Sequence, residues 1–132
     1  MIAYSTDYDP PAPVIPVVIQ SPFTRRKRRM APALIDTGAD VTAVPEAFVT
    51  SLELPTLRRL RVAGLENEWE TVETYSARVR LEPRVEVRVE VIASTHDFVI
   101  LGRDVLNQLK IQLDGPGLTT EILAFQPSLP GV

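Results

Sequence analysis

The most constraining feature of the sequence is the alternation of valine with charged residues between positions 85 and 91. Valine occupies every second place, and Glu86, Arg88 and Glu90 fill the places between. Successive side chains of a β-strand point to opposite faces, so one face here is apolar and the other is solvated. The pattern predicts a half-buried strand of an antiparallel sheet.

The rest of the chain also favours short strands over long helices. It contains 12 prolines and 6 glycines, and no alternation of strands with long helical segments is present. We therefore expect an all-β, closed-barrel-like domain with one or two short helices. Strands are expected over 14–20, 31–35, 57–63, 69–81, 98–101, 111–113 and 118–125, and short helices over 46–52 and 103–109.

Length and composition indicate one globular domain. A chain of 132 residues has room for one core, which we place at residues 14–125, between a flexible N-terminal arm at 1–13 and a C-terminal tail at 126–132. The lack of cysteine excludes disulfides and thiolate zinc sites, and the single histidine, His96, gives little support for a metal site. No apolar run approaches a membrane span and no signal peptide is recognisable. We expect a cytoplasmic protein that requires no membrane and no cofactor.

A basic run interrupts the otherwise acidic sequence. Arg25–Arg26–Lys27–Arg28–Arg29 holds 5 of the 14 basic residues, which leaves 9 basic against 17 acidic residues elsewhere. Such a run can bind nucleic acid or act as a targeting signal. No aromatic residue interleaves it, so a solvated hairpin tip is the favoured interpretation and nucleic acid an unlikely partner. A site of proteolytic processing stays open as a third alternative.

The stretch Leu34–Ile35–Asp36–Thr37–Gly38–Ala39–Asp40 is the strongest candidate for chemistry. Two apolar residues lead into an acid, a hydroxyl and a glycine, which indicates a strand that ends abruptly in a tight turn. Glycine allows close approach to the backbone, and a buried strand would hold the Asp36 carboxylate rigidly. Asp36 is therefore the candidate catalytic residue.

A second apolar strand, also ended by glycine, follows some sixty residues later. It reads Ile100–Leu101–Gly102–Arg103–Asp104. Taken together with Asp36–Thr37–Gly38–Ala39–Asp40 and a glycine-containing hairpin between them, it resembles the retropepsins, the retroviral-type aspartic proteases. The segment from Pro45 to Leu52 is similar to an extra helix of cellular and bacterial relatives. This resemblance implies the acid protease fold and the activity of an endopeptidase.

The resemblance also implies a role for each matching residue. Asp36 would be the catalytic aspartate, Thr37 would brace the paired loops of a dimer, and Gly38 would place backbone against the substrate. Asp40 would form a structural ion pair with Arg103. The residues implied to contact substrate or form the flap are Ala39, Asp40, Ala63, Gly64 and Leu65.

The chemistry leads to a dimer by a separate argument. Hydrolysis by this route needs two carboxylates around one water molecule, one ionised and one protonated, which share a proton. The sequence holds one Asp-Thr-Gly motif and no second copy, so a two-fold homodimer would supply the second Asp36. Residues 118–125 are expected at the interface, near the 14–19 strand of the other subunit. Activity on peptides would favour mildly acidic pH.

Two alternatives remain open at the level of sequence. The segment Gly64–Leu65–Glu66–Asn67–Glu68 holds less glycine than a familiar retropepsin flap, so the chain could be a binding or assembly module of this fold with little turnover. A nucleic-acid-binding domain that uses Arg25–Arg29 is the second alternative, and a less favoured one.

Overall fold

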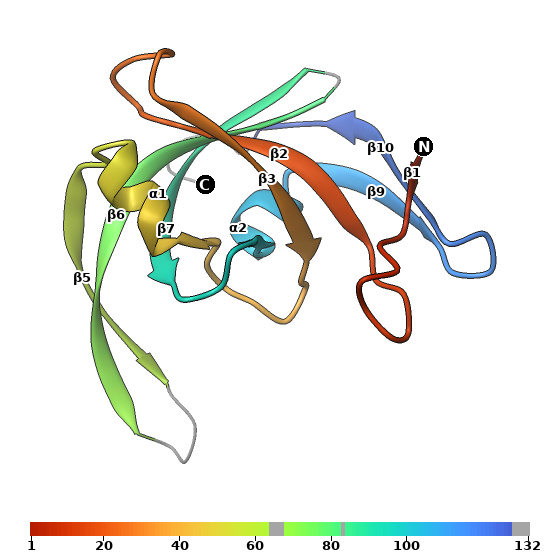
Figure 1. Cartoon of the computed structure of the whole chain (residues 1–132), viewed down its shortest axis with the longest axis horizontal. Helices are drawn as coiled ribbons and strands as arrows, with labels where there is room; N and C mark the ends of the chain where they lie inside the picture. Colours follow the sequence, from red (N-terminus) through yellow and green to blue (C-terminus); the bar gives the residue numbers. More distant parts are fainter. Residues whose placement is uncertain (64–67, 83, 128–132) are drawn as a thin grey trace.

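The computed structural model describes residues 1–63, 68–82 and 84–127, and it is mostly β (Figure 1). The expected flap residues Gly64 and Leu65 lie outside the described residues. The strands are β1 (Ile2–Ala3), β2 (Val14–Gln20), β3 (Arg28–Ile35), β4 (Ala43–Pro45), β5 (Thr56–Ala63), β6 (Trp69–Leu81), β7 (Val85–Ser94), β8 (Val99–Leu101), β9 (Leu109–Asp114) and β10 (Thr119–Phe125); the helices are α1 (Glu46–Ser51) and α2 (Arg103–Leu106).

Six strands form a closed barrel. Neighbours pair in the order β2, β3, β8, β4, β7 and β6, and β6 pairs again with β2 to close the ring. Strand β5 extends from β6 as a long antiparallel ribbon that projects beyond the barrel (Figure 1). A separate sheet of β1, β10 and β9 lies on the other side. The all-β, closed-barrel expectation is confirmed.

The alternating valines build the barrel interior as predicted. Val85, Val87, Val89 and Val91 of β7 are all buried, while Glu86 and Arg88 are exposed. Burial of these side chains contributes about 25 cal/mol per Å² of apolar surface removed from water. The other strands supply matching residues to one core cluster, among them Ile15, Val17, Ile19, Val79, Val99 and Leu101.

Pro16 lies in the part of β2 that has a neighbouring strand on one side only. Pro16 lies opposite Pro32 of β3. Ile35 N donates to Pro13 O at 3.1 Å, and hydrogen-bonded and non-hydrogen-bonded pairs alternate along an antiparallel ladder. Counted from there, Pro16 and Pro32 form a non-hydrogen-bonded pair, which needs no N–H from either residue. On its other side, β2 pairs with β6 only over Val18–Gln20. Pro16 therefore lies at a free edge, where proline is tolerated.

The N-terminal segment differs from a free arm. Ile2–Ala3 pairs with Thr119–Thr120 of β10, Ser5 bridges to Ala12, and the ring of Tyr8 meets Phe98 edge-on at 6.3 Å. The pairing with β10 joins the first residues to a strand more than a hundred residues away in the sequence.

The second helix is shorter than expected. It ends at Leu106 rather than at Leu109, because Leu109 begins β9 and pairs with Phe125 of β10. Val105 and Leu106 are buried as expected. No helix in the described part of the chain is long and apolar enough to cross a membrane.

A polar cluster fastens the β5–β6 ribbon to the barrel. Arg58 of β5 donates from Nε and Nη2 to the two carboxylate oxygens of Glu90 on β7 at 2.7 and 2.8 Å, and Thr74 Oγ1 on β6 donates to Glu90 Oε2 at 2.6 Å. The hydrogen bond from Arg58, followed by that from Thr74, holds the pKa of Glu90 below its ordinary value. Glu90 thus lies on the polar face of β7, as the valine alternation predicts, and also binds two residues of neighbouring strands.

Glu90→Gln should destabilise the fold in a pH-dependent way. A carboxylate whose pKa is lowered by folding contributes stability above its unfolded pKa of about 4.3 and loses it as the pH falls through the folded pKa. The variant should therefore unfold at lower urea concentration than the parent at about pH 7, and the difference should shrink at about pH 3. Glu70→Gln, at an exposed position of β6, is the matched control. An equal difference at both pH values would contradict the assignment.

Candidate active site

Two strands deliver the two motifs to one edge of the barrel. β3 and β8 run parallel, with Ile35 in register with Leu101, and Asp36 N donates to Leu101 O at 3.0 Å. The carboxyl ends of parallel strands meet at the same edge of a sheet, so Asp36 and Gly102 leave the barrel side by side. The structure thereby brings together two motifs that are some sixty residues apart.

The Asp36 carboxylate is held by the turn that follows it. Gly38 N donates to Asp36 Oδ1 at 2.9 Å, and Ala39 N donates to Asp36 O at 3.2 Å. A Cβ at position 38 would lie 3.2 Å from Asp36 Oδ1, and the φ of Gly38 is outside the left-handed region. Close approach of the carboxylate, rather than an unusual backbone conformation, therefore favours glycine here. Asp36 Oδ2 has no hydrogen-bond partner in the described chain.

Arg103 links the turn at residues 36–40 to α2. Its Nη1 donates to Thr37 O at 2.6 Å, its Nη2 contacts Asp40 Oδ1 in a close ion pair, and its backbone N donates to Ala39 O at 2.8 Å. One side chain thus fixes the start and the end of the Asp36 turn. The structure brings Asp40 and Arg103 together in the pairing that the resemblance implies.

Thr42 and Asp104 are structural residues of the site that the sequence did not reveal as a pair. Thr42 is fully buried; its Oγ1 donates to Asp104 Oδ1 at 2.6 Å and accepts from Gly102 N at 3.1 Å. Thr42 N and Val105 N also donate to the Asp104 carboxylate, at 3.0 and 2.9 Å. A threonine in the apolar run 41–44 was the one available signal, since a buried hydroxyl requires a partner.

Gly102 allows the two loops to cross at contact distance. A Cβ there would lie 2.8 Å from Val41 C and 3.0 Å from Ala39 O. Both are backbone atoms, which cannot move aside as the end of a flexible side chain can. The crossing therefore requires glycine at the end of β8 for a steric reason.

Among the described residues, the side chains of the other candidates take no part in this hydrogen-bond network. Thr37 is exposed and its hydroxyl has no partner among the described residues, so its bracing role needs a group from elsewhere. Ala63 lies exposed at the end of the β5–β6 ribbon, where it pairs with Trp69. His96 is an exposed loop residue, as expected, and its ring stacks on Phe98 at 4.8 Å.

The site of a single chain contains one carboxylate that is free to react. Asp40 is paired with the Arg103 side chain and Asp104 with that of Thr42, whereas the Asp36 carboxylate has no side-chain partner among the described residues and accepts one hydrogen bond from backbone. Among the described residues no group of three or more histidine, cysteine or acidic side chains could hold a metal ion. The arrangement can position one carboxylate towards water and a substrate carbonyl.

Thr42→Val should destabilise the protein although it keeps the shape of the side chain. It removes the partner of the buried Gly102 N–H and one donor to Asp104, and an unsatisfied buried group costs about 1–3 kcal/mol. We expect a loss of that size in the free energy of unfolding, measured by urea denaturation. Thr71→Val, at an exposed position of β6, serves as the control. A loss no larger than that of the control would contradict the role of Thr42.

Comparison with known proteins gives the family. The model of the family described as "gag-polyprotein putative aspartyl protease" matches residues 27–108, well over half of the chain and both motifs. No curated protein matches the sequence significantly.

Solved structures of retroviral proteases share the fold. EIAV protease with a bound inhibitor is 20% identical, with a TM-score of 0.51 over 80% of this chain and 92% of the other. A foamy viral protease–reverse transcriptase in complex with an RNA/DNA hybrid is 23% identical, with a TM-score of 0.52 over 89% of this chain; the match spans only 14% of that longer protein. Simian foamy virus (mac) protease is 26% identical, with a TM-score of 0.48 over 67% of this chain and 87% of that one. The chain belongs to the gag-polyprotein aspartyl protease family and has the retropepsin-like fold.

Proposed function

We propose that the protein is an aspartic endopeptidase that hydrolyses peptide bonds as a two-fold homodimer. The observation that carries the proposal is the geometry of the Asp36 carboxylate, which follows directly after β3. Its Oδ1 accepts a hydrogen bond from Gly38 N at 2.9 Å, and its Oδ2 has no partner in the described chain. Family membership supports proteolysis by aspartate in general.

Two copies of Asp36 would supply the two roles that the reaction needs. One carboxylate, ionised, takes a proton from the attacking water, and the other, protonated, donates a hydrogen bond to the carbonyl oxygen of the scissile bond. Like charges in contact do not both ionise readily, so the pair retains one proton. The exposed Thr37, next to Asp36, would then find its hydrogen-bond partner in the mate's loop.

The C-terminal sheet has an edge suited to pairing with a second chain. β1 covers β10 only at Thr119 and Thr120, so the backbone of residues 121–125 on that side has no neighbouring strand among the described residues. Leu123 on this stretch is 47% exposed. An uncovered edge of this kind readily pairs with another strand. We place the dimer interface at this edge, whereas the expected proximity to the strand at 14–19 has less support, because β6 covers β2 over Val18–Gln20 and Pro16 on the remaining free edge lacks an N–H.

The substrate is an extended peptide in this proposal. It would lie across the two Asp36 turns and under the two β5–β6 ribbons, with backbone hydrogen bonds to both. Apolar side chains next to the scissile bond are the expected preference.

Asp36→Asn should abolish hydrolysis and leave the dimer in place. The amide cannot act as a base or share a proton, so the rate should fall by roughly 10³-fold. Cleavage is measured by mass spectrometry after digestion of a peptide library at several pH values, with and without a pepstatin-type inhibitor, and the assembly by sedimentation. Glu46→Gln, at an exposed position of α1, is the control. Parental activity in Asp36→Asn would mean that Asp36 is not catalytic.

Specific activity should fall on dilution. If each site needs one Asp36 from each chain, a solution of monomers has no complete site, and activity per chain should drop in step with the dimer fraction measured by sedimentation at the same concentrations. Unchanged specific activity in a solution that contains only monomers would contradict the shared site.

A further inference from the structure

Four neighbouring strands of the barrel turn a basic face towards solvent. The cross-strand register aligns Arg28 of β3 with Gln20 of β2, Gln20 with Arg78 of β6, and Arg78 with Arg88 of β7. Side chains in register point to the same face of a sheet, and neighbouring strands are about 4.8 Å apart. We define this arginine face by six residues: Arg25, Arg28, Arg78, Arg80, Arg84 and Arg88.

The arginine face carries an excess of positive charge on an acidic protein. Its six guanidinium groups are accompanied by the carboxylates of Glu82 and Glu86, which leaves a local excess of four positive charges, while the whole chain has a net charge of −3. Glu86 is shared by Arg25 at 3.8 Å and Arg78 at 3.7 Å. Both distances exceed those of a hydrogen bond, so the guanidinium groups keep donors for another anion.

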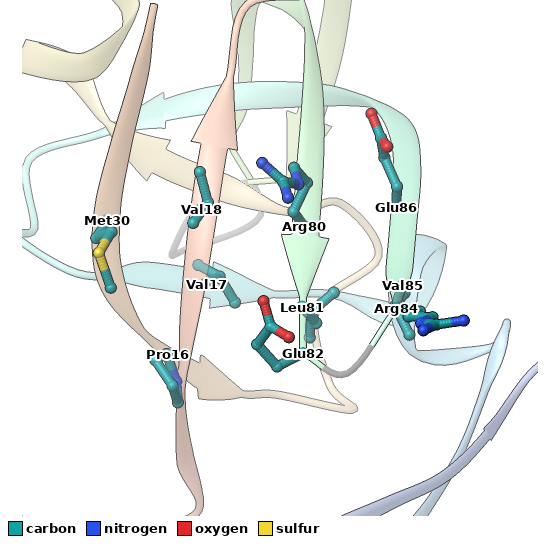
Figure 2. Close-up of a pocket in the computed structure, with 10 residues that line it drawn as sticks. All are labelled: Pro16, Val17, Val18, Met30, Arg80, Leu81, Glu82, Arg84, Val85 and Glu86. Carbon is teal, nitrogen blue, oxygen red and sulfur yellow. The ribbon is translucent and has the colours of Figure 1, made fainter. Parts of the chain in front are cut away.

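A largely apolar groove opens at one end of this face, beside Arg80 and Arg84. Pairing between β2 and β6 ends at Val18 and Arg80. Beyond this pair, towards Pro16 on β2 and Glu82 on the other side, the chain leaves a groove of about 350 Å³. Figure 2 shows Arg80, Glu82, Arg84 and Glu86 on β6, β7 and the turn between them, with the side chains of β2 and Met30 of β3 beside them. The apolar lining consists of Pro16, Val17, Val18, Met30, Leu81 and Val85.

Met30 is the most conspicuous part of this lining. It is 76% exposed although it lies within a strand of the barrel wall. A flexible thioether side chain adapts to irregular apolar partners and is common at binding surfaces. Exposed apolar surface ringed by charge is typical of an interaction site.

The chemistry of the groove favours a peptide over a nucleic acid. Glu82 and Glu86 separate the cations of the lining, which suits a few separately placed carboxylates better than a continuous phosphate backbone, and the lining holds no aromatic ring on which a base could stack. Pro16 lacks an N–H, so the free edge of β2 does not suit the addition of a strand. Recognition would therefore rest on side chains.

We propose that the arginine face and its groove form a docking site for an acidic segment of a partner protein. An apolar side chain of the segment enters the groove beside Met30, and carboxylates on either side of it pair with Arg80 and Arg84. Arginine suits this role because its planar guanidinium can bind a carboxylate through two parallel hydrogen bonds. The site lies on the barrel wall, apart from the Asp36 turn, and it does not depend on proteolysis.

The test measures binding to the Asp36→Asn protein, so that no probe is cleaved. The probe is a fluorescein-labelled peptide with two central leucines flanked by glutamates, followed by fluorescence polarisation at low and physiological ionic strength. Comparison peptides replace the glutamates with glutamine or the leucines with serine, and a labelled single-stranded oligouridylate represents nucleic acid. The acidic leucine peptide should bind more tightly than all three, and its binding should weaken with salt.

Variants localise the binding. Arg80→Ala/Arg84→Ala should weaken binding of the acidic peptide by about tenfold, and Met30→Ala should weaken it by a few-fold through loss of apolar contact. Arg59→Ala/Arg61→Ala removes the same charge from β5 and should leave binding unchanged. Circular dichroism checks that each variant is folded.

Three results would overturn the proposal. These are no binding of the acidic peptide, tighter binding of the oligouridylate than of the peptide, and equal losses in the β5 control and in Arg80→Ala/Arg84→Ala. Because binding is measured without hydrolysis, any of these would leave the peptidase proposal intact, and an inactive peptidase would leave the docking site intact.

Discussion

The active-site region depends on the parallel pairing of β3 with β8. Their register puts the hydrogen bond from Asp36 N to Leu101 O at the end of both strands, and everything beyond it follows from that alignment. The loops can cross only because Gly102 has no side chain to meet Val41 and Ala39. Arg103, the next residue, then contacts Thr37, Ala39 and Asp40 of the turn that follows Asp36.

Around this crossing, the carboxylates of Asp40 and Asp104 have side-chain partners, whereas that of Asp36 has none among the described residues. Arg103 neutralises Asp40, and the buried Thr42 hydroxyl engages Asp104. The Thr42 hydroxyl is buried, and a buried polar group without a partner is costly, so its contact with Asp104 holds the loops in one arrangement. The Asp36 carboxylate differs because it accepts a hydrogen bond only from the backbone of Gly38, and its Oδ2 has no partner among the described residues. In the proposed homodimer, a second chain would supply another Asp36 and cover the free stretch of β10.

Much of the fold could be predicted from the chain because local patterns dominate it. The valine alternation gave a strand with the correct buried face, and both glycine-ended motifs occur where strands end. The prediction of a helix as far as Leu109 was wrong, because Leu109 joins β9, and two further contacts also depend on distant residues: Ile2–Ala3 pairs with β10, and Glu90 is bound by Arg58. None of these partners is close in sequence, so no local propensity could indicate them.

The sequence by itself determined the chemistry that is available: one Asp-Thr-Gly motif, no cysteine, a single histidine, and strands that bury one face. These follow from residue identity and from the two-residue period of a strand. Only the tertiary structure decided which groups meet. Cross-strand register aligned Arg28, Arg78 and Arg88 on one face and left a groove beside Met30. The crossing of the two loops at Gly102 also paired Thr42 with Asp104. Backbone hydrogen bonds between β3 and β8 fix where these loops begin, and therefore which side chains become neighbours.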